Sequence, residues 1–299
     1  MPGDGYNLLV VLGPTATGKT HLAVELARRL GGEVVSADSR QVYRGLDIGA
    51  GKDLDAYQTP GGPVAHHLID IVDLEQEFSL FDFQQQFYRV FEELRGRGAM
   101  PVLAGGSGLY LESVLFGYEL VEAPRDDALR AELACLSMEQ LASRLRALQG
   151  QLHNTTDLTS RERAVRAIEI AECARRNPPP PAPAVRSLVL GIRMPRRTLR
   201  ERMEQGLVEE VEGLRARGVS WERLDSLGLE YRWVARYLRG EIGNRNDLVL
   251  KLHAAICRFA KRQESWFRRM ERRGMRIRWL ESCDPDGAWA EIHASRPAP

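Results

Sequence analysis

Short apolar runs alternate with helical patterns over residues 1–117 of the chain. Leu8 to Leu12 is an apolar run that leads through a glycine-rich turn into a helical stretch from Thr20 to Leu30. Val34 to Asp38 and Val102 to Gly105 are further apolar runs that end in polar residues or glycine. Between them, apolar side chains recur at helical spacing from Phe83 to Leu94, and Ser79 with Asp82 predicts a capping box at the start of this helix. This alternation predicts an α/β fold with a parallel sheet flanked by helices, in which the carboxyl-terminal ends of the strands face a ligand.

The pattern changes after Gly117. From Asp126 to Arg176 helical segments follow one another without strands, and the prolines of residues 178–181 close this stretch. The prolines predict a stiff, extended connector, and a recognition motif for another protein is the alternative. Ser187 to Ile192 is again an apolar strand pattern, which returns the chain to the sheet. We therefore expect a P-loop-type catalytic core made of residues 1–117 and 185–299, with a helical insertion domain at residues 118–184.

A long amphipathic helix is predicted near the end of the chain. Its apolar stripe consists of Leu252, Ile256, Phe259, Gln263, Trp266 and Met270. The opposite side carries Arg258, Arg262, Arg269 and Arg272. From Arg258 to Arg278 there are nine Lys or Arg and two Glu, a local charge of +7 in a chain whose net charge is +1. Such a block favours a polyanionic partner, and a solvated helix face is the alternative that charge alone leaves open.

The composition excludes several classes of protein. Hydrophobic residues make up 43% and charged residues 28% of the chain, as is typical of globular proteins. No apolar run reaches the roughly eighteen residues that would span a bilayer, and the N-terminal residues do not resemble a secretory signal. The four cysteines are far apart in the sequence, so we expect reduced thiols and a cytoplasmic location: Cys135, Cys173, Cys257 and Cys283.

Residues 13–20 fit the phosphate-loop pattern GxxxxGK[ST] and lie between a predicted strand and a predicted helix, as this motif requires. Loop amides and the helix N-terminus attract phosphate, Lys19 neutralises it, and Thr20 can hold Mg²⁺. The expected phosphate-binding residues are Gly13, Pro14, Thr15, Ala16, Thr17, Gly18, Lys19 and Thr20. The loop alone does not distinguish pyrophosphate from a nucleotide. A P-loop kinase whose metal-binding strand is Val34 to Asp38 is therefore the main alternative.

Residues 36–49 read Ser-Ala-Asp-Ser-Arg-Gln-Val-Tyr-Arg-Gly-Leu-Asp-Ile-Gly. With the phosphate loop, this segment resembles the tRNA dimethylallyltransferase family, also called isopentenylpyrophosphate:tRNA transferases, whose pattern is S-x-D-S-x-Q-x-Y-x-G-x-D-I-G. Further matches follow in the order of the family: residues 67–70, Pro101 with 105–110, Arg163 and Arg166 in an Arg-Ala-Ile-Glu helix, and 261–263 with 266–268. The resemblance extends from about Leu8 to Leu280, so coincidence is not a reasonable explanation.

The resemblance implies a reaction. The phosphate loop would hold the pyrophosphate of dimethylallyl pyrophosphate, and ATP would not be consumed. Asp38 would take the proton from the N6 amine of the adenine 3′-adjacent to the anticodon, flipped out of its stack. Lys19, Mg²⁺ and the loop amides would stabilise the departing pyrophosphate. Ser107, which stands where the family more often has Thr, is the third expected catalytic residue, after Asp38 and Lys19. Without the resemblance, Asp38 would be read as a cap and Ser107 as a turn residue.

The resemblance also implies contacts with the anticodon stem-loop of tRNA. The expected residues are Asp38, Ser39, Arg40, Gln41, Arg163, Arg166, Lys261, Arg262, Gln263, Trp266 and Arg268. Arg163 and Arg166 share a helix face that could meet phosphates, and surface ion pairs are the alternative. On the long helix, the apolar stripe is expected to turn four residues outward: Lys261, Arg262, Gln263 and Arg268. We expect a monomer.

The sequence departs from the family in three places. The helix that follows the returning strand is shortened between Met194 and Leu207, and Arg200 or Arg202 is the candidate substitute for a family arginine that contacts the donor pyrophosphate. Residues 230–232 read Glu-Tyr-Arg where the family has Gly-Tyr-Lys/Arg, and residues 49–52 read Gly-Ala-Gly-Lys in place of Gly-Thr-Ala-Lys. A C-terminal Cys/His zinc module is not found in this sequence, which is typical of the bacterial type.

Three rival functions remain open from the sequence. They are a small-molecule kinase, a prenyltransferase that acts on free nucleotides, and a non-catalytic RNA-binding module. The helical insert and the basic helix favour a large anion over AMP. His66 and His67 are adjacent on a predicted strand and so face opposite sides, which indicates structural roles rather than a metal site.

Overall fold

The computed structural model describes residues 5–15, 17–149, 158–193 and 205–295. The chain forms two compact units, one of residues 1–117 and 184–299 and one of residues 118–183. We call them the core and the insert. The return from the insert to the core lies one residue before the position expected from the sequence.

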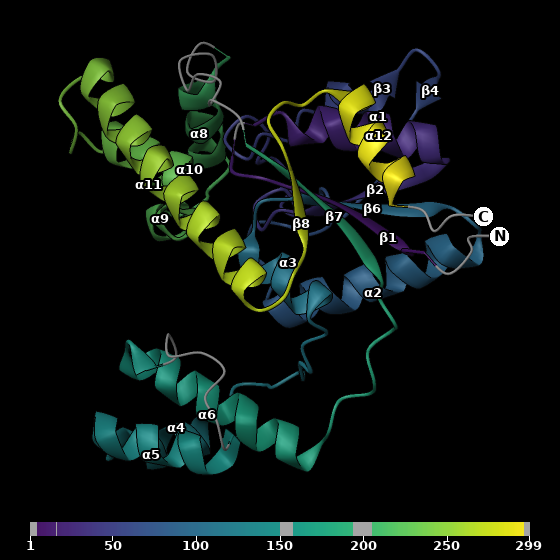
Figure 1. The fold of residues 1–299 in the computed structure, drawn as a ribbon. Helices are drawn as coiled ribbons and strands as arrows, with labels where there is room; N and C mark the ends of the chain where they lie inside the picture. Colours follow the sequence, from purple (N-terminus) through teal and green to yellow (C-terminus); the bar gives the residue numbers. More distant parts are fainter. Residues whose placement is uncertain (1–4, 16, 150–157, 194–204, 296–299) are drawn as a thin grey trace. The chain divides into compact units, whose positions relative to one another are not determined.

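The core is built on a six-stranded sheet in the order β5-β2-β6-β1-β7-β8, in which every pair of neighbours is parallel (Figure 1). Its strands are β1 (Leu8–Leu12), β2 (Gly32–Ala37), β5 (His66–His67), β6 (Met100–Gly105), β7 (Ser187–Ile192) and β8 (Ile277–Leu280). A short antiparallel pair, β3 (Gln58–Thr59) and β4 (Gly62–Pro63), precedes β5. The predicted α/β fold with a parallel sheet is confirmed, and β1 lies between β6 and β7.

Helices cover both faces of the sheet. One face carries α1 (Lys19–Leu30) and α12 (Pro285–Ala294), and the other α2 (Leu80–Gly96), α3 (Gly108–Leu115) and the C-terminal part of α11 (Arg245–Arg272) (Figure 1). Leu9 and Val11 of β1 pack on the first side and Val10 on the second, because successive strand residues face opposite ways. A sheet covered on both faces needs such continuous apolar strands.

The predicted cap of α2 is present. The Ser79 hydroxyl accepts from the Asp82 amide at 3.2 Å, and the Asp82 carboxylate accepts from the Ser79 amide at 2.8 Å. This reciprocal pair satisfies two amide groups that the first helical turn leaves open, and so fixes where the helix begins.

A second apolar cluster of the core is helical. It is formed by α8 (Leu207–Ala216), α9 (Trp221–Leu227), α10 (Leu229–Leu238) and the N-terminal half of α11. Val42 and Leu46, from the segment after β2, pack in the same cluster. The helix α11 therefore joins two apolar layers, with Leu252 in this cluster and Phe267 against the sheet.

The structure corrects two details of α11. Phe267 is buried, whereas Trp266, which we placed on the apolar stripe, is only half-buried. Arg269, expected on the opposite side, donates to the fully buried Glu112 carboxylate at 2.7 Å. The buried line runs through positions 260, 263, 267 and 270, which a 3.6-residue repeat allows as well as the predicted line. Sequence periodicity alone does not choose between them.

The insert has a small core of its own. It consists of α4 (Asp127–Ala134), α5 (Met138–Gln149) and α6 (Arg161–Arg176), which bury Leu133 and Ile168 among other side chains. The buried Glu169 accepts two hydrogen bonds from Arg130, at 2.7 and 2.9 Å, and this pairing lowers the pKa of Glu169 to about 2. Residues 178–186 form neither helix nor strand. None of the described helices is both long and apolar enough to span a membrane.

Candidate active site

The phosphate loop joins β1 directly to α1. Gly18 caps the helix with a φ of 79°, in the left-handed region that glycine adopts without strain. The buried Thr17 hydroxyl donates to the Pro14 carbonyl at 3.0 Å, and the Lys19 ammonium donates to the same carbonyl at 3.2 Å. Ala16 lies outside the described residues. The loop is thus braced by its own side chains, as a preformed anion site requires.

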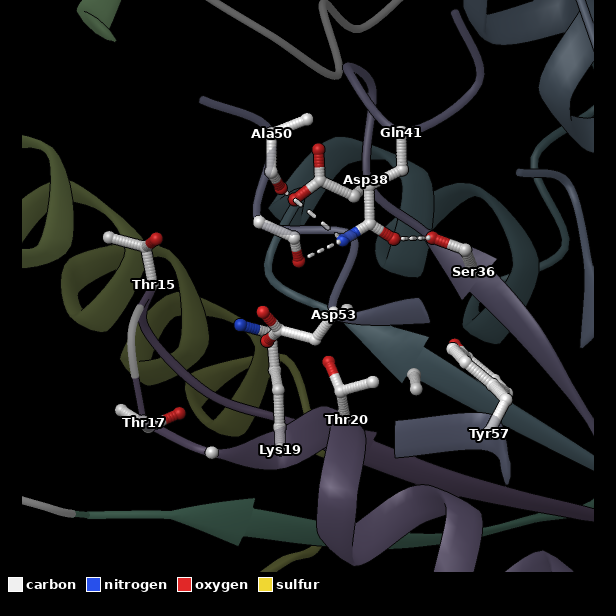
Figure 2. A pocket seen from close by; sticks show the side chains of 14 residues that line it. Thr15, Thr17, Lys19, Thr20, Ser36, Asp38, Gln41, Ala50, Asp53 and Tyr57 are labelled. Atoms are coloured by element: carbon white, nitrogen blue, oxygen red, sulfur yellow. Dashed lines mark hydrogen bonds between the residues drawn. The ribbon is translucent and has the colours of Figure 1, made fainter. Parts of the chain in front are cut away.

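A pocket opens where β1, β2 and β6 end (Figure 2). Lys19 and Thr20 point into it from the phosphate loop and α1, and Asp38 and Gln41 lie across from them (Figure 2). The full lining is Thr15, Thr17, Gly18, Lys19, Thr20, Ser36, Asp38, Gln41, Ala50, Gly51, Asp53, Tyr57, Ala104 and Gly105. The strand order brings these groups together, because β6 lies between β1 and β2 and all three strands run the same way.

Asp38 is the first residue after β2 and is half-buried. Its Oδ1 accepts from the Arg40 amide at 2.9 Å, so the carboxylate is held in a turn rather than at the start of a helix. Among the described residues, no second donor bonds to this carboxylate. The side chain therefore has a fixed position at the pocket and keeps capacity to accept a proton.

The Ser107 side chain and main chain fix the ends of β2 and β6 relative to each other. The Ser107 hydroxyl accepts from the Ser39 amide at 3.2 Å, and the Ser107 amide donates to the Ala37 carbonyl at 3.2 Å. Ser107 thus ties the segment after β6 to the end of β2. Its side chain makes no capping bond to α3. In this position it braces the turn that carries Asp38.

Gln41 connects β2 to the far wall of the pocket. Its Oε1 accepts from the Ser36 hydroxyl at 2.7 Å, and its Nε2 donates to the Gly51 carbonyl at 3.0 Å (Figure 2). Both ends of this amide are therefore used inside the protein. Next to it, burial raises the pKa of Tyr57, and the negative charge of Asp53 adds to this shift. The Tyr57 hydroxyl consequently stays protonated at neutral pH.

The loop of residues 47–52, which forms this wall, is held in place by residues that the sequence analysis did not single out. Lys52 is buried, and its ammonium donates to the Tyr43 carbonyl at 2.9 Å and to Asp47 at 2.8 Å, with a further ion pair to Asp70. The signal was present in the lysine that ends the Gly-Ala-Gly-Lys stretch. Glu210 of α8 accepts from the three successive amides of residues 47–49.

Comparisons with known proteins decide the family. The profile of IPP transferase matches residues 41–270, and that of isopentenyl transferase matches residues 6–59. The chain belongs to the IPP transferase family. The resemblance seen in the sequence is therefore confirmed, and the chain is a prenyltransferase rather than a kinase.

Individual relatives of this family agree over nearly the whole chain. tRNA dimethylallyltransferase 1 of Geotalea uraniireducens is 54% identical over 283 residues, 92% of each chain. tRNA dimethylallyltransferase 2 of Syntrophotalea carbinolica is 54% identical, covering 93% of this chain and 96% of that protein. The crystal structure of the tRNA isopentenylpyrophosphate transferase from Bacillus halodurans superposes with a TM-score of 0.66 at 31% identity, covering 97% of this chain and 95% of that one.

One residue that the IPP transferase resemblance assigned to RNA contact faces inward. Gln263 is buried, its Oε1 accepts from the Thr15 amide at 3.0 Å, and its Nε2 donates to the Gly106 carbonyl at 2.8 Å. A Cβ on Gly106 would lie 2.5 Å from the Gln263 Nε2 and 2.9 Å from the Gly13 carbonyl oxygen, so a larger residue there would displace the Gln263 amide and the loop backbone. The expectation that Gln263 turns outward is wrong, because it lies on the buried line of α11. It fastens this helix to the phosphate loop.

The remaining basic residues expected at the RNA contact do not line this pocket. Lys261, Arg262 and Arg268 are exposed on α11. Trp266 is half-buried, and the Arg269 Cζ lies 4.1 Å from its ring centroid. The ring packs closely on Gly108, where an added Cβ would lie 2.5 Å from it. In the insert, Arg163 donates to the Thr159 hydroxyl, and Arg166 donates to the Ala123 carbonyl and pairs with Glu169. The pair of Arg166 with Glu169 matches the ion-pair alternative.

The departures from the IPP transferase pattern have a local structural basis where the chain is described. Tyr231 is fully buried, its hydroxyl donates to Glu210 at 2.9 Å, and a Cβ on Gly49 would lie 2.6 Å from its ring. Glu230, which replaces a family glycine, is buried, and its Oε2 lies 3.6 Å from the Arg40 Nη1. Arg200 and Arg202, the candidates for the additional pyrophosphate contact, lie outside the described residues.

The cysteines form no disulfide in the described part of the chain. One of them contacts the site: the Cys283 thiol donates to the Thr17 carbonyl at 2.8 Å and lies against Gly18. The histidines of β5 make structural contacts, with His67 2.7 Å from Glu33 and the His66 ring 4.6 Å from that of Tyr57.

Proposed function

We propose that the protein transfers the dimethylallyl group of dimethylallyl pyrophosphate to N6 of the adenine 3′-adjacent to the anticodon in tRNA. The observation that carries this proposal is the pocket in which Asp38 faces the phosphate loop. A carboxylate opposite a phosphate-binding loop suits this reaction, because the amine nucleophile must lose a proton while the prenyl donor loses pyrophosphate. The names of the relatives support the choice of tRNA as the acceptor.

The proposed reaction forms one C–N bond and breaks one C–O bond. The N6 nitrogen of the adenine attacks C1 of the dimethylallyl group, and the electron pair of the C–O bond leaves with pyrophosphate. The proton on N6 passes to the Asp38 carboxylate. An aromatic amine is a weak nucleophile, so removing this proton as attack proceeds lowers the barrier. The Lys19 ammonium and the loop amides stabilise the charge that develops on the departing oxygens.

Mg²⁺ is the proposed cofactor, and the residues present fit it. Among the described residues, no group of three or more His, Cys, Asp or Glu could hold a metal ion by itself. Magnesium at phosphate sites takes only one or two protein ligands, with phosphate oxygens and waters as the rest. The Thr20 hydroxyl, with the Asp53 carboxylate in the same pocket, meets that need. When bound, Mg²⁺ would neutralise part of the pyrophosphate charge.

A transfer assay tests this function against its rivals. The protein is incubated with dimethylallyl pyrophosphate, Mg²⁺ and unmodified tRNA, and each nucleoside is analysed by mass spectrometry. We expect one adenosine to gain the mass of a dimethylallyl group, with pyrophosphate released in equal amount. A tRNA with guanine at that position is the control and should gain nothing. Preferential prenylation of AMP would favour the free-nucleotide enzyme, and ATP turnover without the prenyl donor would favour a kinase.

A further inference from the structure

A second pocket of the core is lined by arginines that come from three segments. They are Arg40 after β2, Arg232 and Arg236 of α10, and Arg258 and Arg262 of α11. We call this set the arginine pocket. The resemblance to the family assigned an RNA contact to only two of its members, Arg40 and Arg262. The pocket is formed by the fold, since α10 and α11 pack on each other through the helical cluster.

Aromatic rings lie among these guanidinium groups. Two of the guanidinium groups face the ring of Phe259, with the Arg40 Cζ 5.6 Å and the Arg262 Cζ 5.7 Å from its centroid. The Arg236 Cζ lies 5.2 Å from the ring centroid of Trp233. Both rings line the pocket and are half-buried. Flat cationic groups beside aromatic rings are the surfaces on which unstacked nucleobases settle.

Too few carboxylates are present to neutralise the arginine pocket. Glu230 lies 3.6 Å from Arg40, and Glu241 lies 3.9 Å from Arg236. Among the residues that the structure describes, the buried Arg236 Nε has no hydrogen-bond partner. Within the described ranges, the following have no carboxylate at ion-pair distance: Arg232, Arg258 and Arg262. Arg232 donates only to the main-chain carbonyl of Asp225, which carries no net charge. Such an excess of positive charge calls for an anionic ligand.

Arg40 connects the arginine pocket to the active site. Its amide donates to the Asp38 Oδ1 at 2.9 Å, and its guanidinium Nε donates to the Leu227 carbonyl at 2.9 Å. The same residue therefore positions the proposed base and forms a wall of the arginine pocket. Arg40 and Asp38 are two positions apart in the chain, so their Cα atoms are about 7 Å apart at most. One wall residue of the arginine pocket is therefore a close sequence neighbour of the carboxylate that would meet the adenine.

We propose that the arginine pocket binds the nucleotide next to the target adenine in the RNA strand. Arg258 and Arg232 contact its phosphate, and its base stacks on Phe259. This proposal rests on the proposed function, because the adenine at Asp38 sets the register. It also explains how RNA is preferred to a free nucleotide: AMP carries no neighbouring nucleotide and leaves the arginine pocket without its ligand.

The test compares one variant with a matched control on the same helix. Arg258→Gln removes a charge from the pocket, and Arg272→Gln removes an equivalent exposed charge of α11 that does not line it. Binding of an anticodon stem-loop RNA is measured over a range of salt concentrations. We expect Arg258→Gln to lower the slope of log affinity against log salt by about 0.7, the value for one phosphate contact on a single strand. The Arg272→Gln slope should equal that of the wild type.

The stacking contact is tested separately. Phe259→Leu keeps apolar bulk and removes the ring, and we expect RNA affinity to fall about 5- to 150-fold with an unchanged salt slope. Phe259→Tyr keeps the ring and should restore wild-type affinity. Affinity for dimethylallyl pyrophosphate should be unchanged in all of these variants, because the phosphate loop is intact.

Two results would overturn the assignment. One is a wild-type salt slope in Arg258→Gln; the other is an equal loss of slope in Arg258→Gln and Arg272→Gln, which would indicate a general field of the helix. Transfer by the wild type is measured in parallel. Normal transfer with either result overturns the arginine pocket alone, whereas no transfer by the wild type overturns the proposed function.

Discussion

The phosphate-loop pocket and the arginine pocket belong to the same core but are built differently. The first lies at the ends of three parallel strands, and internal hydrogen bonds fix its side chains, among them Gln41 to Gly51 and Ser107 to Ser39. The second consists of long arginine side chains, most of them on two helices. In a preorganised polar pocket, a few groups supply most of the contribution to binding and catalysis. In a cluster of exposed charges, each group contributes little, and the binding energy is divided among many of them. Single substitutions should therefore be severe in the first pocket and mild and salt-dependent in the second.

The largest effect is expected at Lys19. Lys19→Ala removes the cation that we propose binds the donor pyrophosphate and stabilises its departure, so kcat/KM should fall about 10³- to 10⁵-fold. Affinity for the anticodon stem-loop should stay near the wild-type value, since the proposed RNA contacts are made by other residues. Transfer kinetics and a filter-binding assay measure the two quantities. An equal loss of RNA affinity would break the distinction between the two pockets.

Asp38→Asn should lower the single-turnover rate about 10²- to 10⁴-fold, the usual contribution of a positioned general base. Asparagine can still accept the hydrogen bond from the Arg40 amide, so the turn and the thermal stability should be retained. Saturating donor and tRNA are used, because slow product release would otherwise hide a slower chemical step. Asp55→Asn is the control, as Asp55 is exposed and does not line the pocket. A wild-type rate in Asp38→Asn would leave the general base unidentified.

Gln263 sharpens the comparison because it lies on the basic helix but bonds to the phosphate loop. Gln263→Leu removes the hydrogen bonds to Thr15 and Gly106, so the KM for dimethylallyl pyrophosphate should rise about 5- to 30-fold, equivalent to about 1–2 kcal/mol. RNA affinity measured without donor should hardly change. The opposite pattern, weaker RNA binding with normal donor KM, would restore Gln263 to the RNA contact.

The smallest effect is expected at Lys261, an exposed residue of α11 that does not line the arginine pocket. If Lys261 contacts one phosphate, Lys261→Gln should reduce the salt slope of stem-loop binding by about 0.7 and leave donor KM unchanged. A slope identical to the wild type would identify this position as a solvated part of the helix. The RNA contact would then be concentrated in the arginine pocket.

Much of the fold could be read from local patterns. The apolar run of β1, the phosphate-loop motif and the start of α1 follow one another within residues 8–30, so short-range rules were sufficient. The reciprocal cap of Ser79 and Asp82 was foreseen for the same reason. The strand β8 was missed because it has only four residues, too few for a periodic pattern.

Polar side chains that are buried in the fold were harder to foresee. Lys52 is buried against Asp47 and Asp70, and a lone lysine in a glycine-rich stretch reads as solvated until the chain returns to cover it. Gln263 was expected to face outward because the resemblance to the family assigned it to the RNA contact, although it also lies on the predicted apolar stripe. Its role depends on Thr15, which lies 248 residues away along the chain.

The sequence by itself determined the phosphate loop, the α/β alternation, the helical insert and the basic character of α11, because each depends on spacing within about one helix or strand. Only the tertiary structure decided which strand ends meet, and so placed Asp38 across from Lys19. It also gathered Arg232, Arg258 and Arg40 around one pocket. The physical reason is that helix packing and strand order are set by burial of apolar surface over the whole chain, and no local pattern encodes which distant side chains that burial brings together.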